Sequence, residues 1–122
     1  MTNLNEISKQ FHERAKQKGF WDDKREIGTL LMLVVSELSE ALEADRKNMH
    51  CDFDTFDKMN RNDIQFNQAF YANIKDSFED EIADTFIRLF DLVGFLGIDI
   101  DRQIELKMKY NESRPHKHGK AY

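Results

Sequence analysis

The stretch LLMLVVSELSEAL at residues 30–42 decides the fold class. Its apolar residues recur every three or four positions, as on one face of an α-helix, and the pattern runs from Ile27 to about residue 46. Two glutamates, Glu37 and Glu40, interrupt the apolar run three residues apart. Like charges at this spacing lie about 60° apart on a helix and repel each other. Helix stability alone therefore does not explain why both residues are acidic.

A second stretch, SFEDEIADTFIRLFDLVG at residues 77–94, repeats the arrangement. Glu81 and Asp84 are again three residues apart within a pattern that is apolar on most sides and continues to Leu96. This pattern predicts a central, buried helix that ends at Gly97. If the two helices pack antiparallel, as neighbours in a small bundle usually do, the two acidic pairs can converge on one point.

Four converging carboxylates predict a metal site. Partly buried carboxylates are costly together unless they are protonated or neutralised by a cation. Oxygen-only ligation suits Mg²⁺, with Mn²⁺ as a possible substitute, and Mg²⁺ is often shared between carboxylates and the phosphates of a substrate. The alternative, which stays open, is that each pair is a solvated surface. Asp80, Asp91 and Arg88 on the second helix are ambiguous, and Arg88 can pair with Asp84 one turn before it.

Composition narrows the class of protein. With 122 residues, 40% hydrophobic and 34% charged, the chain suits one globular domain with one core. A single proline and five glycines favour helices over a turn-rich β-fold. The net charge of -5 argues against a nucleic acid polymer as partner. No apolar run is long enough for a membrane span, and Cys51 is the one cysteine, so we expect a cytoplasmic protein.

Weaker signals complete the expected architecture. Helical spacing predicts a first helix at about residues 3–18, with Asn3 at its start and Gly19 at its end. Asp99 is expected to cap a last helix. We therefore predict one all-α domain over residues 1–122, a small bundle of four to five helices that is completed by oligomerisation. Helices this apolar exceed what one short chain can cover, so a homodimer or homotetramer is expected.

Two segments lie outside the predicted bundle. Residues 47–75 mix Asn, Asp and aromatic side chains without one clean period, and we interpret them as an irregular insert with a short helix near residues 63–73. Residues from about 109 to 122 form a basic C-terminal tail that Pro115 interrupts. The insert is a candidate for part of a pocket, a lid or a subunit contact.

The order of these motifs resembles the MazG-like nucleoside triphosphate pyrophosphohydrolases, an all-α family. The resemblance is carried by LMLVVSELSEALEADRK, SFEDEIADTFIRLFDLVG and KYNESRPHKHGK, together with the upstream KGFW. It implies a Mg²⁺-dependent hydrolase that cleaves ribo- or deoxyribonucleoside triphosphates to the monophosphate and pyrophosphate. The implied role is control of nucleotide pools or removal of damaged nucleotides. The separation between Glu40 and Glu81 is longer than is usual in compact members of the family.

The resemblance also implies roles for individual residues. The metal ligands and catalytic residues would be Glu37, Glu40, Glu81 and Asp84, with Glu40 a candidate for orienting the attacking water. The tail would supply phosphate contacts from Lys109, Asn111, Arg114 and Lys117. Without the resemblance, the tail is interpreted as a frayed terminus. Trp21 follows the break at Gly19 and is a candidate either to stack on a nucleobase or to cover the end of the bundle.

Two other functions compete with this interpretation. A di-iron carboxylate bundle normally needs Glu-x-x-His on two helices, and none of the four histidines has a glutamate three residues before it. The remaining alternative is a non-enzymatic helical interaction module whose acidic pairs are surface charge. It predicts that loss of the charge on Glu81 removes no activity.

Overall fold

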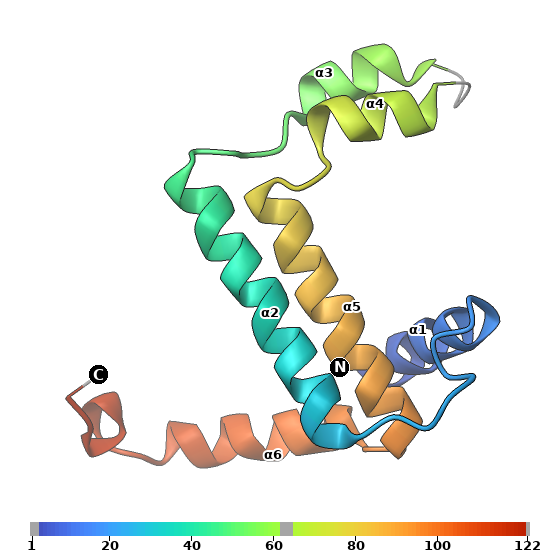
Figure 1. The fold of residues 1–122 in the computed structure, drawn as a ribbon. Coiled ribbons are helices and arrows are strands. Elements are labelled where there is room, and N and C mark those ends of the chain that lie inside the picture. The colour runs from blue at the N-terminus through green and yellow to red at the C-terminus, as the bar shows by residue number, and fades with distance from the viewer. Residues whose placement is uncertain (1–2, 62–64, 122) are drawn as a thin grey trace. The chain divides into compact units, whose positions relative to one another are not determined.

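The computed structural model describes residues 3–61 and 65–121, and the secondary structure in these residues is entirely helical, which confirms the all-α class. The α-helices are α1 (Leu4–Gln17), α2 (Ile27–Arg46), α3 (Phe53–Met59), α4 (Phe66–Asn73), α5 (Phe78–Leu96) and α6 (Ile100–Glu112), and a 3-10 helix, His116–Gly119, follows α6 (Figure 1). These described helices number six, so the prediction of four to five was too low. The additional helix lies in the segment that we expected to be irregular.

The chain divides into two units. The central unit comprises Asp23–Leu89, and the terminal unit comprises the residues up to Asp22 together with those from Phe90 onward. Helix α5 passes from the central unit to the terminal unit. The candidate carboxylates belong to the central unit, whereas Trp21 and the basic tail belong to the terminal unit.

In the central unit, α2 and the first half of α5 lie side by side and run antiparallel (Figure 1). The register is set near one end by a hydrogen bond of 2.8 Å from the Phe78 amide to the Met49 carbonyl, and farther along by a contact between Arg88 and Glu37. Small and branched side chains of α2 are buried, namely Leu30, Val34, Ala41 and Ala44. Because Ala41 and Ala44 carry short side chains, the two helices can approach closely.

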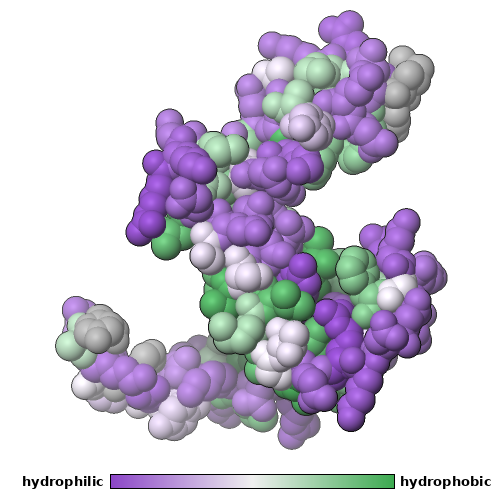
Figure 2. Space-filling model, viewed as in Figure 1, coloured by the Kyte–Doolittle hydropathy of each residue, from purple (hydrophilic) through white to green (hydrophobic). Residues whose placement is uncertain are grey.

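A second apolar face of α2 is exposed among the described residues. Its members follow the spacing of a helical stripe and are each between 46% and 50% exposed: Ile27, Leu31, Val35, Leu38 and Leu42. Phe86 and Ile87 on α5 are also exposed, which corrects the expectation of a central, buried helix. Figure 2 shows hydrophobic surface over the region of α2 and α5.

The segment expected to be an irregular insert forms two packed helices, which corrects the prediction for residues 47–75. Asp52 caps α3 by accepting a hydrogen bond from the Thr55 amide, and the rings of Phe56 and Phe66 meet edge to face at 5.8 Å between α3 and α4. Ala69 in α4 is fully buried. The predicted short helix corresponds to α4, and residues 63 and 64 of that prediction lie outside the described residues. Helices of seven or eight residues make only about two turns, too few to display a period.

In the terminal unit, the N-terminal ends of α1 and α6 cap each other. Asp101 accepts hydrogen bonds from the backbone amides of Leu4 and Asn5, and the side-chain oxygen of Asn5 accepts from the amides of Ile100 and Asp101. The predicted cap at Asp99 is confirmed, because its carboxylate accepts from the Arg102 amide. Asn3 is the residue that precedes α1, as predicted, although its side chain makes no capping hydrogen bond.

Helix α1 also packs closely on the second half of α5. A Cβ atom added at Gly94 would lie 2.4 Å from the Ser8 carbonyl oxygen, so the close approach of the two helices requires glycine there. Beside this contact, His12 Nδ1 lies 2.9 Å from Asp91 Oδ1. In the part of the chain that the structure describes, no helix has the length and apolar character needed to cross a membrane.

Candidate metal centre

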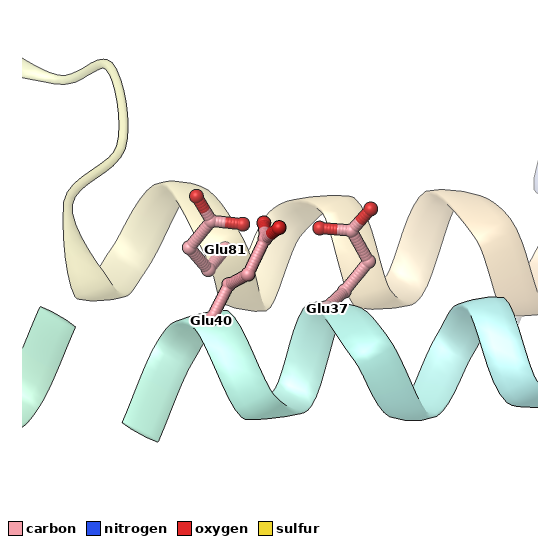
Figure 3. A group of neighbouring side chains, drawn as sticks. All are labelled: Glu37, Glu40 and Glu81. Atoms are coloured by element: carbon pink, nitrogen blue, oxygen red, sulfur yellow. The ribbon is translucent and has the colours of Figure 1, made fainter. Parts of the chain in front are cut away.

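The antiparallel register of α2 and α5 brings three of the four predicted ligands together. Glu37 and Glu40 are one turn apart on α2, and Glu81 is in the first turn of α5. Figure 3 shows the three carboxylates side by side between the helices. One oxygen from each residue lies within 4.8 Å of the oxygens of the other two. This grouping confirms that residues 41 positions or more apart in sequence converge at one point.

Burial makes Glu81 the unusual member of the group. Glu81 is 5% exposed and Glu37 is 8% exposed, whereas Glu40 faces solvent. Among the described residues, no hydrogen-bond partner reaches the buried Oε2 of Glu81. Burial, reinforced by the neighbouring Glu40 and Glu37, raises the pKa of the Glu81 carboxyl to about 8. Without a cation, this carboxyl therefore holds a proton at neutral pH.

Asp84 lies near the group without joining it. It is half-buried on α5, and burial together with the charges of Asp80 and Glu37 raises the pKa of its carboxyl. A second acidic group consists of Glu81, Asp76 and Asp80. In that group, Asp80 accepts a hydrogen bond from the Asp76 amide and Asp76 pairs with Lys75, so both aspartates already have partners.

Arg88 pairs with a predicted ligand rather than with Asp84. Its Nε donates to Glu37 Oε1 at 2.7 Å, across the interface between α5 and α2. The Glu37 side chain is 10% exposed and that of Arg88 is 38% exposed. The hydrogen bond of Arg88 therefore goes to Glu37, and the prediction that Arg88 pairs with Asp84 was wrong. Sequence spacing favoured the local pair because it carries no information on which residue of the other helix lies opposite.

The three carboxylates fit a hard divalent cation. Mg²⁺ binds oxygen ligands at about 2.1 Å, so ligand oxygens on opposite sides of the ion are about 4.2 Å apart. The three carboxylate oxygens lie within 4.8 Å of one another, a spacing compatible with one ion bound between them. The unpartnered Glu81 oxygen is the strongest sign of fit, because a buried polar atom without a partner is costly. Carboxylate oxygens also suit Mn²⁺.

Trp21, the predicted base-stacking residue, has partners within the terminal unit. Its Nε1 donates to both carboxylate oxygens of Asp91, at 2.9 and 3.1 Å. Its ring stacks on that of Phe95, with centroids 4.2 Å apart. These contacts fix the orientation of the indole, and one of its faces is covered by Phe95. The His12 ring also contacts the indole edge to face, with centroids 5.0 Å apart, and stacking of Trp21 on a nucleobase stays a prediction.

The predicted phosphate contacts lie on the end of α6 and beyond it. Lys109 and Lys117 are exposed, and Asn111 is half-buried with no hydrogen-bond partner for Oδ1 among the described residues. The Arg114 guanidinium lies over the Tyr110 ring, 5.4 Å from its centroid. The segment 109–112 is helical, so the basic tail begins inside α6. The role of these four residues in binding phosphate stays a prediction.

In comparisons with family models, curated proteins and solved structures, nothing matches the chain.

Proposed function

We propose that this chain is a Mg²⁺-dependent nucleoside triphosphate pyrophosphohydrolase, which cleaves ribo- or deoxyribonucleoside triphosphates to the monophosphate and pyrophosphate in the cytoplasm. The observation that carries the proposal is the buried Oε2 of Glu81, which has no hydrogen-bond partner among the described residues and lies beside Glu37 and Glu40. A carboxylate cluster of this kind is costly unless it is protonated or neutralised by a cation, and a hard cation with water ligands left over is suited to phosphate substrates. Glu37, Glu40, Glu81 and Asp84 would hold Mg²⁺, or Mn²⁺ in its place.

The proposed roles of the four carboxylates differ with their exposure. Bound Mg²⁺ would neutralise the charge of the triphosphate and of the leaving pyrophosphate. Glu37 and Glu81 are buried and suit a fixed ligand role. Glu40 faces solvent, so its carboxylate can orient the attacking water and accept its proton. Asp84 is half-buried on the same helix as Glu81 and would complete the ligand set.

The residues proposed to recognise the substrate are Lys109, Asn111, Arg114 and Lys117 for the phosphates and Trp21 for the base. Arginine and lysine form strong charge-assisted hydrogen bonds to phosphate oxygens. The net charge of the protein is -5, so these few cationic groups are better suited to bind a metal-bound triphosphate than to bind a nucleic acid polymer.

The direct test is product identification by phosphorus NMR. The purified protein is incubated with Mg²⁺ and a panel of ribo- and deoxyribonucleoside triphosphates. We expect monophosphate and pyrophosphate in equal amounts, and no reaction when EDTA removes the metal. Release of inorganic phosphate with a nucleoside diphosphate, or no turnover of any triphosphate in the panel, would contradict the proposal.

We also propose that the uncovered apolar face of α2 packs against a second copy of the chain, which gives a homodimer or a homotetramer. The five exposed residues of the face are continuous with its buried side, as expected for a helix that is covered on two sides. In light scattering coupled to size exclusion, the wild type should have at least twice the chain mass. Replacing Leu31 and Leu38 by Lys should lower the measured mass to that of one chain.

A matched control places the same charge elsewhere on α2. Ser36 is exposed and lies about 140° to 160° around the helix from Leu31 and Leu38, so Ser36→Lys should leave the oligomer intact. A wild-type protein that is monomeric at micromolar concentration would contradict the proposed assembly.

A further inference from the structure

A cationic side chain lies within the acidic site, and the proposed metal chemistry does not account for it. Arg88 is four residues after Asp84 and seven after Glu81 on α5, so its side chain leaves the helix on the same face as theirs. From there, its Nε donates to Glu37 Oε1 at 2.7 Å. Arg88 therefore contacts a proposed metal ligand on the neighbouring helix.

The bond to Glu37 occupies a small part of the hydrogen-bonding capacity of Arg88. A guanidinium has five N–H donors in a fixed plane, and the bond through Nε uses one of them. Within the described residues, Arg88 has no other hydrogen bond or ion pair. Its side chain is 38% exposed, so part of Arg88 is accessible to solvent.

From these observations we propose that Arg88 binds a phosphate group of the substrate with its terminal nitrogens while its Nε holds Glu37. This inference rests on the proposed function, because it takes the substrate to carry a polyphosphate. The planar guanidinium can bind a carboxylate along one edge and a phosphate along another, which a lysine ammonium cannot do with the same geometry. Anchoring by Glu37 also lowers the conformational entropy that Arg88 loses when phosphate binds.

Charge gives a second reason for this assignment. Glu37, Glu40, Glu81 and Asp84 repel a polyphosphate, and one divalent cation compensates only part of their charge. A guanidinium beside the ligands adds positive charge where the phosphates would lie, as arginines do in other phosphoryl-transfer sites. If Arg88 served only to neutralise Glu37 in the metal-free protein, it would have no effect on phosphate binding once the metal is bound.

The test measures binding of metal and binding of phosphate separately. Mn²⁺ alone is titrated by electron paramagnetic resonance, and inorganic triphosphate is titrated by calorimetry in the presence of Mg²⁺. In Arg88→Gln, the triphosphate affinity should fall roughly 10- to 100-fold, the range for loss of a hydrogen bond to a charged group. The Mn²⁺ affinity should stay within about threefold or increase, since a positive charge near the carboxylates has been removed. Arg88→Lys should give an intermediate triphosphate affinity.

Arg46 provides the matched control. It is an exposed arginine on α2, nine residues after Glu37 and therefore about 180° around the helix from it, and Arg46→Gln should change neither affinity.

Three results would overturn the assignment of Arg88. They are unchanged triphosphate affinity in Arg88→Gln, an equal loss of Mn²⁺ and triphosphate affinity, and a wild type that binds Mn²⁺ but not triphosphate. An Arg88-dependent triphosphate affinity without hydrolysis of any nucleotide would support the assignment and contradict the proposed activity, so the two failures are distinguishable.

Discussion

Replacing Glu81 by Gln is expected to abolish Mg²⁺-dependent hydrolysis while the helical fold survives. Glu81 is the most buried member of the carboxylate group, and the amide has nearly the same shape but cannot supply a charged ligand. Loss of residues that only support a metal ligand typically costs 10- to 100-fold, so loss of the ligand itself should lower kcat/KM by at least about 100-fold. Steady-state kinetics with the preferred triphosphate, beside circular dichroism of the same sample, measures both effects.

Glu43→Gln is the matched control for this variant. Glu43 is an exposed glutamate on α2 that pairs with Lys47 at 3.4 Å, and its replacement should leave kcat/KM within about twofold. Full turnover by Glu81→Gln would contradict the proposed role of Glu81 and favour the non-enzymatic interaction module, in which the acidic pairs are surface charge.

The second large effect concerns stability in the absence of metal, which should fall as the pH rises from about 5 to about 8. Burial raises the pKa of the folded-state Glu81 carboxyl to about 8 from an ordinary value of 4.5. Between these values the folded state retains a proton that the unfolded state releases, so the free energy of unfolding decreases with pH. The pKa difference sets an upper limit of roughly 5 kcal/mol, shared with the neighbouring carboxylates.

Glu81→Gln should remove most of this pH dependence. With EDTA present, the variant should be more stable than the wild type at pH 8 and similar to it at pH 5, because its amide carries no charge at either pH. Urea unfolding of both proteins across this range measures the difference, in which contributions from other titrating groups cancel. If the free energy of unfolding changed with pH by the same amount in both proteins, the assigned pKa of Glu81 would be contradicted. Added Mg²⁺ should stabilise the wild type at pH 8 and have little effect on the variant.

The long helices could be predicted from sequence because their signals are local. The boundaries of α2 and α5 follow apolar periodicity, and the end of α5 follows Gly97, which adopts the left-handed conformation with φ of 65°. The cap at Asp99 is likewise a short-range interaction. In contrast, the caps that Asp101 and Asn5 exchange join residues 96 positions apart, and no short motif marks them.

The same distinction applies to the candidate site. The spacing of Glu37 and Glu40, and of Glu81 and Asp84, shows from sequence that each pair shares one helical face. Which carboxylates meet depends on the register of α2 against α5, and that register places Glu81 with the α2 pair and Asp84 outside the group. The partners of Arg88 and Trp21 also lie on distant segments, so Glu37 and Asp91 could not be assigned to them from spacing.

By itself, the sequence determined the helical class of this protein, the extent of its long helices and the acidic faces of α2 and α5, because periodicity and capping act over a few residues. Only the tertiary structure decided that α3 and α4 form a packed pair, that Glu81 is buried with no partner for one oxygen among the described residues, and that Arg88 contacts Glu37. These features arise from side-chain packing between segments far apart in the chain, where burial and opposing charges are set by neighbours that local spacing does not specify.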